Sequence, residues 1–240
     1  MLDQLDLNQL LFLDIETVPE VYHYSDLDPK TKSLWEQKMK WQIEKDDTSA
    51  ENLFEKAGIF AEFGKIICIS VGFLVNAGTP SVKYRTTSFA GDDEKELLVN
   101  FANLLNTHYN RQDRYMCAHN GKEFDFPFIA RRMLINGIRL PLMLNIAGKK
   151  PWEIKHLDTL ELWKFGDYKH YTSLNLLAHL FGIATPKDDI SGADVAKVYY
   201  EEGDIDRIVT YCEKDTLTVC QLLLKYKGMK LIEDDQIIRI

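Results

Sequence analysis

The chain has 240 residues, a formal net charge of −8 at pH 7, 45% hydrophobic residues and 28% charged residues. This length suits one large domain or two small ones, with enough chain for a sizeable core. The acidic balance excludes a protein that coats nucleic acid with a broad basic face, but it is compatible with an enzyme that holds a few phosphates locally. No apolar run approaches the roughly 20 residues that a membrane-spanning helix needs, so no membrane partner is expected.

The N-terminus argues against a signal peptide, and the cysteine spacing argues against a zinc knuckle or a redox motif. The segment MLDQLDLNQ carries acids where a signal peptide carries Lys or Arg, so a cytoplasmic location is expected. The four cysteines form no C-x-x-C pair, so the sequence indicates neither a zinc knuckle nor a redox motif. We expect Cys68 and Cys117, which lie in apolar runs, to be buried thiols.

Strand and helix signals follow one another in an order typical of an α/β domain. Apolar runs predict strands at 9–17, 65–75, 81–88 and 114–120. Periodicity and capping residues predict helices at 31–45, 91–109, 126–136, 172–182, 192–203 and 204–226, and a short helix near 157–163. Residues 21–58 read as a helical insertion after the first strand. We expect a single domain over residues 1–240.

The first strand carries two carboxylates inside an apolar run, LLFLDIETVPE at 10–20. Side chains alternate along a strand, so Asp14 and Glu16 share a face with Leu10 and Phe12, and the residues between them take the other face. A strand that is apolar on both faces is typical of the centre of a sheet covered by helices. Two adjacent carboxylates repel by about 4 kcal/mol at about 4 Å and an effective dielectric near 20, so a cation should lie between them.

A second acid follows a turn, in the stretch HNGKEFDFPFIARRM. Asp125 precedes Pro127 at the start of a predicted helix, where Asp is also a preferred N-cap. Asn120, beside Gly121, also fits an ordinary turn residue. Taken alone, neither residue requires a functional role.

The last predicted helix carries a tyrosine and an acid four residues apart. Tyr211 and Asp215 therefore stack on one helical face. By itself this pattern also fits an amphipathic helix with an acid at the edge of its buried face. Glu213 and Lys214 are expected to face solvent.

The three fragments together are far more specific than any one of them. D-x-E on a strand, N-x-x-x-F-D before a helix and Y-x-x-x-D on a late helix resemble the tyrosine-containing branch of the DEDD (DnaQ-like) superfamily of 3′–5′ exonucleases. The sequence resembles in particular stand-alone bacterial proteins predicted to be related to the proofreading exonuclease domain of family-B DNA polymerases. EFGKIICISVGF, HLDTLELWKFGDY and SLNLLAHLFGI also read like that family, and the resemblance covers most of residues 8–226. It implies a ribonuclease H-like fold, a mixed β-sheet flanked by helices.

The resemblance implies a catalytic set of Asp14, Glu16, Asp125, Tyr211 and Asp215, in which the four acids bind two divalent cations. Oxygen ligands without His or Cys suit Mg²⁺ or Mn²⁺ rather than zinc. By resemblance Asp14 bridges the two ions, Glu16 and Asp215 complete the first site, and Asp125 supports the second. We expect Tyr211 to orient the attacking water, because ionising a phenol of pKa about 10 near pH 7 costs about 4 kcal/mol.

Four residues near these acids are candidate substrate contacts. Thr17 offers its N–H or hydroxyl to the terminal nucleotide, and Val18 offers its side chain to the sugar or base. Asn120 matches the asparagine that lies near the cleaved end in the polymerase domains. Phe124 fits either a wedge beside a base or a core side chain.

Two overlapping segments have the composition of a nucleic-acid contact. Residues 164–173 interleave cations with aromatic side chains, which fits either a strand-binding surface or a solvated loop. Residues 139–169 carry six Lys or Arg and four Asp or Glu. Local binding of phosphates and a solvated loop with scattered lysines both fit this composition.

The sequence predicts a metal-dependent 3′–5′ exonuclease that releases nucleoside 5′-monophosphates from single-stranded DNA. One alternative is an exoribonuclease similar to RNase D. The helical C-terminal domains that help such enzymes hold structured RNA are absent from this sequence, which favours DNA. A non-catalytic nucleic-acid-binding module that retains the fold is the other alternative, and the presence of all four acids and the tyrosine favours the enzyme. A protein partner is compatible with the sequence but not identified by it.

Overall fold

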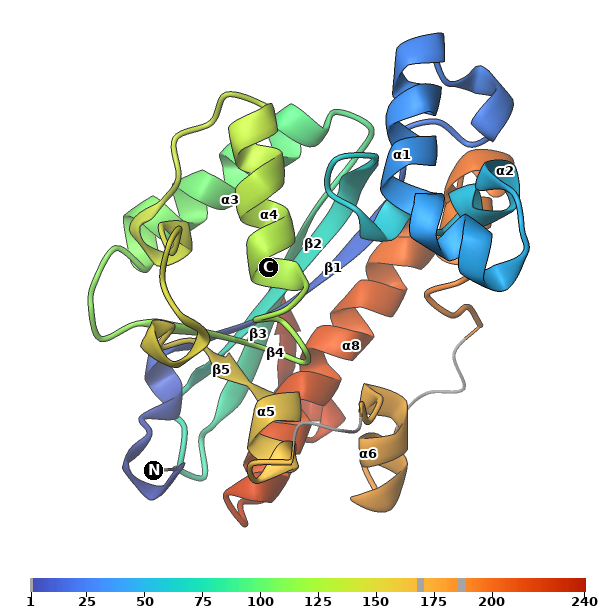
Figure 1. The fold of residues 1–240 in the computed structure, drawn as a ribbon. Coiled ribbons are helices and arrows are strands. Elements are labelled where there is room, and N and C mark those ends of the chain that lie inside the picture. Colours follow the sequence, from blue (N-terminus) through green and yellow to red (C-terminus); the bar gives the residue numbers. More distant parts are fainter. Residues whose placement is uncertain (1, 168–170, 185–188) are drawn as a thin grey trace.

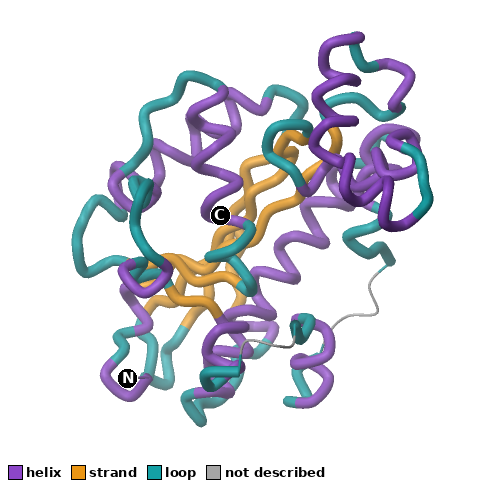
Figure 2. Tube along the Cα trace, viewed as in Figure 1, coloured by secondary structure: helices purple, strands orange, loops and turns teal. Residues whose placement is uncertain are grey.

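The computed structural model describes residues 2–167, 171–184 and 189–240. Within them, strands form one mixed sheet in the order β5-β4-β1-β2-β3-β6, with helices on both faces (Figures 1 and 2). The strands are β1 (Leu10–Pro19), β2 (Gly64–Val75), β3 (Lys83–Ala90), β4 (Tyr115–Ala118), β5 (Leu157–Asp158) and β6 (Ile237–Arg239). The helices are α1 (Pro29–Asp46), α2 (Ala50–Leu53), α3 (Glu94–His108), α4 (Asp125–Ile135), α5 (Thr159–Lys164), α6 (Leu174–Leu180), α7 (Val195–Lys197) and α8 (Ile205–Tyr226). The predicted fold class, a mixed α/β sheet flanked by helices, is confirmed.

Strand β1 lies at the centre of the sheet, antiparallel to β2 and parallel to β4. Its odd-numbered residues from Leu11 to Ile15 pack against α3 and α4, whereas Leu10 and Phe12 pack against α8. Burying each such side chain stabilises the fold by about 1.5–3 kcal/mol. The alternation is the predicted one, and it turns the two acids of β1 toward α8.

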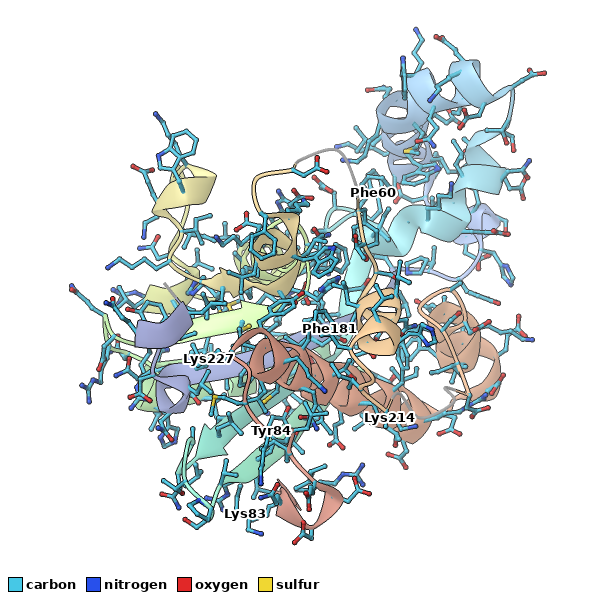
Figure 3. The ribbon with its side chains drawn as sticks, turned by 90° about the horizontal axis from the view of Figure 1, so that it is seen from below. Phe60, Lys83, Tyr84, Phe181, Lys214 and Lys227 are labelled. Carbon is cyan, nitrogen blue, oxygen red and sulfur yellow. The ribbon has the colours of Figure 1, made fainter. Side chains whose placement is uncertain are left out.

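The segment after β1 forms a small helical unit with its own apolar cluster. Trp35 on α1 is fully buried and donates from Nε1 to the carbonyl oxygen of Ala50 at 2.8 Å. Phe54, Phe60 and Phe63 meet its ring edge-on, with centroids 5.1–5.7 Å away (Phe60 is labelled in Figure 3). Helical structure within residues 21–58 is therefore confirmed, and the single domain stays a prediction.

A buried ion pair fixes helix α4 against the rest of the molecule. Arg132, only 4% exposed, donates to the Glu94 carboxylate on α3 at 2.8 and 2.6 Å and to Glu20 after β1 at 2.6 Å. The same guanidinium donates to the carbonyl oxygen of Ala61, and Glu94 accepts from the N–H of Ile66 at 2.7 Å. Removing one partner of such a pair leaves a buried charge uncompensated, which costs about 3–5 kcal/mol. The network therefore holds the helix that begins with Asp125.

Besides β5, which occupies the start of the helix expected near 157–163, two elements differ from the sequence prediction. The helix expected at 192–203 is the short α7 followed by a π-helical turn, Val198–Glu202, which ends at Gly203 with a positive φ of 65°. Strand β6, which pairs parallel to β3, was not expected because three residues are too short to carry a strand pattern. Of the helices in the described ranges, none has the length and apolarity to cross a membrane.

Strand β6 explains a wrong prediction on α8. Glu213, expected to face solvent, has a side chain only 13% exposed. It forms an ion pair with Arg239 of β6 at 2.8 Å and accepts from the Ser88 hydroxyl of β3 at 3.2 Å. The outer face of the helix at this point is covered by an element that the sequence pattern did not predict.

Candidate active site

Helix α8 lies across the face of β1 that carries the two acids. The carboxylates of Asp14 and Glu16 and the thiol of Cys212 offer ligand atoms within 4.8 Å of one another. Tyr211 is next to Cys212, and Asp215 lies one turn later on α8. The charge of Asp215 acts on Asp14, and the charges of Asp14 and Glu16 act on the Tyr211 hydroxyl. Helix α8 therefore packs against the face of β1 that carries Asp14 and Glu16.

Asp125 reaches the same cluster from the other side of the sheet. It is 3% exposed and is the first residue of α4, whereas the N-cap is Phe124. The alternative of a simple N-cap is therefore not the observed geometry. Burial raises the pKa of Asp125 to about 7, while hydrogen bonds from the N–H groups of Asp125 and Ile15 lower it. The positive end of the α4 dipole also faces this carboxylate.

The carboxylates raise one another's proton affinity. Burial is the largest cause that raises the pKa of Asp14 well above its ordinary value, followed by the charges of Glu16, Asp125 and Asp215. Burial, followed by the charge of Asp215, likewise raises the pKa of Glu16. Without a cation, burial and mutual repulsion therefore favour the protonated forms of Asp14 and Glu16.

The cluster fits divalent cations. Among the described residues, no lysine or arginine forms an ion pair with Asp14, Glu16 or Asp125. Buried carboxylates need a compensating charge, and oxygen donors suit Mg²⁺ or Mn²⁺. The Cys212 thiol, which donates to the backbone oxygen of Asp14 at 3.3 Å, adds a soft donor atom that the sequence interpretation did not include. A thiol that follows a tyrosine on a helix carries no sequence signal of its own, so only the packing of α8 on β1 identifies it.

The Tyr211 hydroxyl remains a phenol in this setting. Burial raises its pKa most, followed by the charges of Asp215, Glu16 and Asp14. A neutral hydroxyl donates and accepts hydrogen bonds but is a poor base at neutral pH. The environment therefore favours the orienting role over the role of a proton acceptor.

The loop before α4 is held by a buried carboxylate on β5. Asp158 accepts from the N–H groups of Asn120 at 2.9 Å and Lys122 at 3.1 Å. It also caps α5 by accepting from the N–H groups of Leu160 and Glu161. Asn120 takes a positive φ of 61°, which asparagine tolerates better than most residues. Its turn geometry is thus confirmed, and its contact with a substrate stays a prediction.

An exposed tyrosine adjoins the acids from the segment before α6. Tyr171 is 67% exposed, and after burial the charges of Asp125, Asp158 and Asp14 raise its pKa. His119 fixes this segment, because its Nε2 donates to the carbonyl oxygen of Thr172 at 2.9 Å. Tyr171 is thereby an exposed aromatic residue of segment 164–173 whose pKa responds to the acids, and residues 168–170 of that segment lie outside the described residues.

The expected substrate contacts differ in accessibility. Thr17 is half-buried and follows a shift in the β1–β2 register, an irregularity that often re-aims side chains beside active sites. Val18 is fully buried under Val195 and Val198, so its side chain is not available to a sugar or base. Phe124 packs against the core and lies 5.4 Å from the Phe128 ring, which fits the core alternative.

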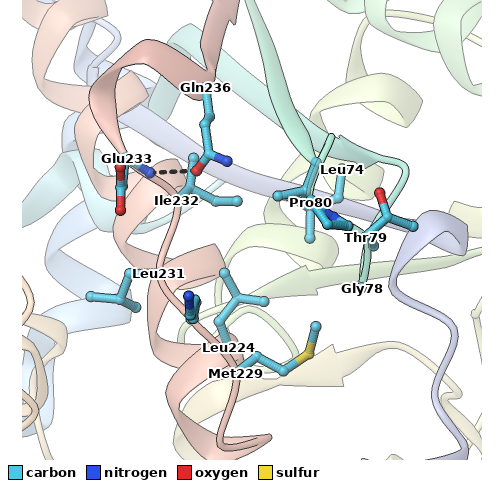
Figure 4. Close-up of a pocket in the computed structure, with 13 residues that line it drawn as sticks. Leu74, Gly78, Thr79, Pro80, Leu224, Met229, Leu231, Ile232, Glu233 and Gln236 are labelled. Atoms are coloured by element: carbon cyan, nitrogen blue, oxygen red, sulfur yellow. Dashed lines mark hydrogen bonds between the residues drawn. The ribbon is translucent and has the colours of Figure 1, made fainter.

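One pocket with an apolar lining lies away from the acids. A pocket of about 510 Å³ opens between the β2–β3 connection and the C-terminal segment, lined by Leu74, Leu224, Met229 and Ile232 among others (Figure 4). None of the acids above lines it. The acid cluster, and not this pocket, holds the carboxylate oxygens that suit a divalent cation.

Comparison with known proteins agrees with this geometry. Residues 59–236 match the model of a family described as predicted 3′–5′ exonucleases related to the exonuclease domain of PolB. The chain belongs to this family. The matched region includes Asp125, Tyr211 and Asp215 and begins after β1. Family membership confirms the resemblance noted in the sequence.

The fold of this predicted exonuclease is also that of part of a polymerase. It aligns with the structure of the family B DNA polymerase from the hyperthermophilic archaeon Pyrobaculum calidifontis, with a TM-score of 0.53 and 12% sequence identity. The alignment covers 90% of this chain and 24% of that polymerase, so the chain spans about a quarter of the polymerase's length. At this identity the likeness establishes the fold alone.

Proposed function

We propose that the protein is a 3′–5′ exonuclease that uses two divalent cations, Mg²⁺ or Mn²⁺, to remove nucleoside 5′-monophosphates from single-stranded DNA. The observation that carries this proposal is the convergence of four carboxylates and Tyr211 from β1, α4 and α8. The relation of its family to a polymerase exonuclease domain supports DNA as the substrate. The cytoplasmic location stays a prediction from the sequence.

Each of these residues has a distinct role in the proposed reaction. Asp14 would hold both cations, Glu16 and Asp215 would complete one site, and Asp125 would support the other. Bound there, the cations would supply charge neutralisation and Lewis acidity at the scissile phosphodiester. Tyr211 would fix the attacking water in line with the leaving oxygen, which lowers the barrier by positioning.

The terminal nucleotide would lie between the loop before α4 and the segment before α6. Asn120, held by Asp158, and Thr17, next to the β1 acids, would donate hydrogen bonds to the sugar and phosphate. The exposed ring of Tyr171 would stack on the terminal base, since base–aromatic stacking contributes about 1–3 kcal/mol. Phe124 supports this loop from the core side.

The test uses 5′-labelled single-stranded DNA and RNA of the same sequence, each incubated with Mg²⁺, Mn²⁺ or EDTA. We expect a ladder that shortens from the 3′ end of the DNA, requires a metal ion and releases nucleoside 5′-monophosphates. Faster shortening of the RNA would replace DNA by RNA as the substrate. Binding without shortening of either strand would support the non-catalytic alternative.

Replacing Tyr211 by phenylalanine tests the role of the hydroxyl. We expect kcat to fall by about 10–100-fold because the water loses its orienting contact, while the affinity for Mn²⁺ measured by calorimetry stays the same. The pH dependence of log kcat should keep its shape, since the raised pKa of Tyr211 leaves it a phenol throughout the neutral range.

The matched control is Tyr200→Phe, which removes a hydroxyl that donates to the carbonyl oxygen of Pro19 at 2.6 Å, beyond the acids. Its kcat should equal that of the wild type. If log kcat of the wild type changes with pH and this change disappears in Tyr211→Phe, proton transfer would instead be assigned to the tyrosine.

A further inference from the structure

A basic pocket exists in this acidic chain, away from the carboxylate cluster. Loop 109–114 and segment 142–156 enclose about 270 Å³, and its charged lining is Arg111, Arg114, Lys149, Lys155 and Glu153. Four cations and one acid thus line it, although the whole chain carries a net charge of −8. We call these residues the basic pocket.

The two lysines of the basic pocket carry the charge that is available to a ligand. Arg111 is held by Asp113 through two hydrogen bonds of 3.0 and 2.9 Å, and Arg114 donates to the carbonyl oxygen of Asn8. Lys149 and Lys155 are exposed, and neither forms an ion pair with any described residue. Their ammonium groups are therefore free to bind an external anion.

Further polar groups around the pocket favour an anion. The Nε of Arg114 is buried and has no hydrogen-bond partner among the described residues. Glu153 already accepts from the N–H of Lys150 at 2.7 Å, so part of its acceptor capacity is used within the chain. An unpaired buried donor is unfavourable, and an oxygen ligand that hydrogen-bonds to it would remove this cost.

An exposed indole lies in the same segment as the two lysines of the basic pocket, outside the pocket lining. Trp152 is 77% exposed, and the ammonium of Lys150 lies 5.2 Å from its ring centroid. Cations interleaved with an accessible aromatic ring are the usual composition of a surface that binds a single strand, because the backbone is attracted and the bases stack. Free phosphate uses the cations and has no use for the indole.

The position of the basic pocket relates it to the acid cluster through two parallel strands. Arg114 directly precedes β4 and His156 directly precedes β5. At the other ends of these strands lie Asp158 and the loop with Asn120, next to Asp125. A strand of the length of β4 spans about 13 Å. The basic pocket is therefore too far away for the terminal nucleotide and lies where an upstream part of a strand can reach it.

We propose that the basic pocket binds backbone phosphates of the nucleic-acid strand upstream of the cleaved end, with Lys149 and Lys155 as the phosphate contacts and Trp152 as a stacking surface. This inference rests on the proposed function for the direction of the strand. The locally basic segment would thus hold a long substrate while the acids remove its end. The short products and short substrates do not reach it.

The test compares the wild type with Lys149→Gln/Lys155→Gln. Binding of a fluorescein-labelled 20-nucleotide DNA is measured in EDTA between 50 and 200 mM KCl, and kcat/KM is measured with Mn²⁺ for 20- and 2-nucleotide strands. For single strands, log K falls with log salt with a slope of about −0.7 per phosphate contact. The double variant removes two such contacts, so its slope should be less negative by about 1.4. We expect about tenfold weaker binding of the 20-mer at 50 mM salt, a lower kcat/KM on the 20-mer and an unchanged kcat/KM on the 2-mer.

The matched control is Lys30→Gln/Lys95→Gln, which removes two exposed lysines on α1 and α3 and should keep the wild-type slope. Trp152→Phe should remove the fluorescence quenching that the 20-mer causes in the wild type. An unchanged slope in Lys149→Gln/Lys155→Gln overturns the proposal, and so does an equal loss of kcat/KM on both strand lengths. Calorimetric binding of inorganic phosphate that depends on both lysines, with an unchanged 20-mer slope, overturns the strand assignment in favour of a free-phosphate site. If Lys149→Gln/Lys155→Gln reduces the salt slope but the wild type cleaves neither strand, the basic pocket is supported and the proposed exonuclease activity is refuted.

Discussion

Replacing Asp14 by asparagine should abolish metal-dependent shortening of the 3′ end while the protein stays folded. The charges of Glu16, Asp125 and Asp215 all raise the pKa of Asp14, and its carboxylate offers a ligand atom within 4.8 Å of those of Glu16 and Cys212. The amide keeps the size of the side chain and removes the charge that holds a divalent cation. We expect kcat/KM on labelled single-stranded DNA to fall by about 10³-fold or more, equivalent to about 4 kcal/mol of transition-state stabilisation.

The control for this variant is Asp206→Asn, which removes an exposed carboxylate from α8, away from the cluster. Its kcat/KM should be that of the wild type. The thermal midpoint of Asp14→Asn without metal should equal or exceed that of the wild type, because the buried charge is unfavourable there without a cation. Activity of Asp14→Asn within tenfold of the wild type would place the chemistry elsewhere.

The face of each β1 residue was predictable because a strand alternates without reference to the rest of the chain. Leu10 and Phe12 pack toward α8, and Leu11 packs toward α3 and α4, as the pattern required. The i, i+4 spacing likewise placed Tyr211 and Asp215 on one side of α8. The approach of Asp125 to these residues has no local signal, and only the resemblance to a known family predicted it.

The wrong predictions for individual residues have a common physical cause. Each of these residues contacts an element that local sequence patterns do not predict. Val18 was assigned to the substrate, but Val195 and Val198 of a segment far along the chain cover it completely. Glu213 was assigned to solvent, but β6 brings Arg239 next to it. The Arg132–Glu94 pair was not predicted because a charged residue on a helix is usually solvated, and only tertiary packing buries it.

Without a divalent cation, the free energy of unfolding should fall between pH 5 and pH 8, and Asp125 should cause much of this fall. Burial raises the pKa of Asp125 from 3.8 to about 7, so the folded protein binds more protons than the unfolded chain between these values. Stability therefore decreases as the pH rises through this window and levels off above pH 7. The two pH units from 5 to 7 correspond to about 3 kcal/mol, or about 6–12 °C in the thermal midpoint of a chain of this size.

The measurement is the thermal midpoint at pH 5, 6, 7 and 8 in EDTA and in saturating Mn²⁺, for the wild type and Asp125→Asn. In EDTA the Asn variant should lose about 3 kcal/mol of the wild-type pH dependence, because its amide does not titrate. Mn²⁺ replaces the protons that the acids hold, so its stabilisation of the wild type should grow from pH 5 to pH 8 and be smaller in Asp125→Asn. Equal pH dependence in both proteins would show that Asp125 carries no raised pKa, and a Mn²⁺ effect independent of pH would show that the cation does not compete with these protons.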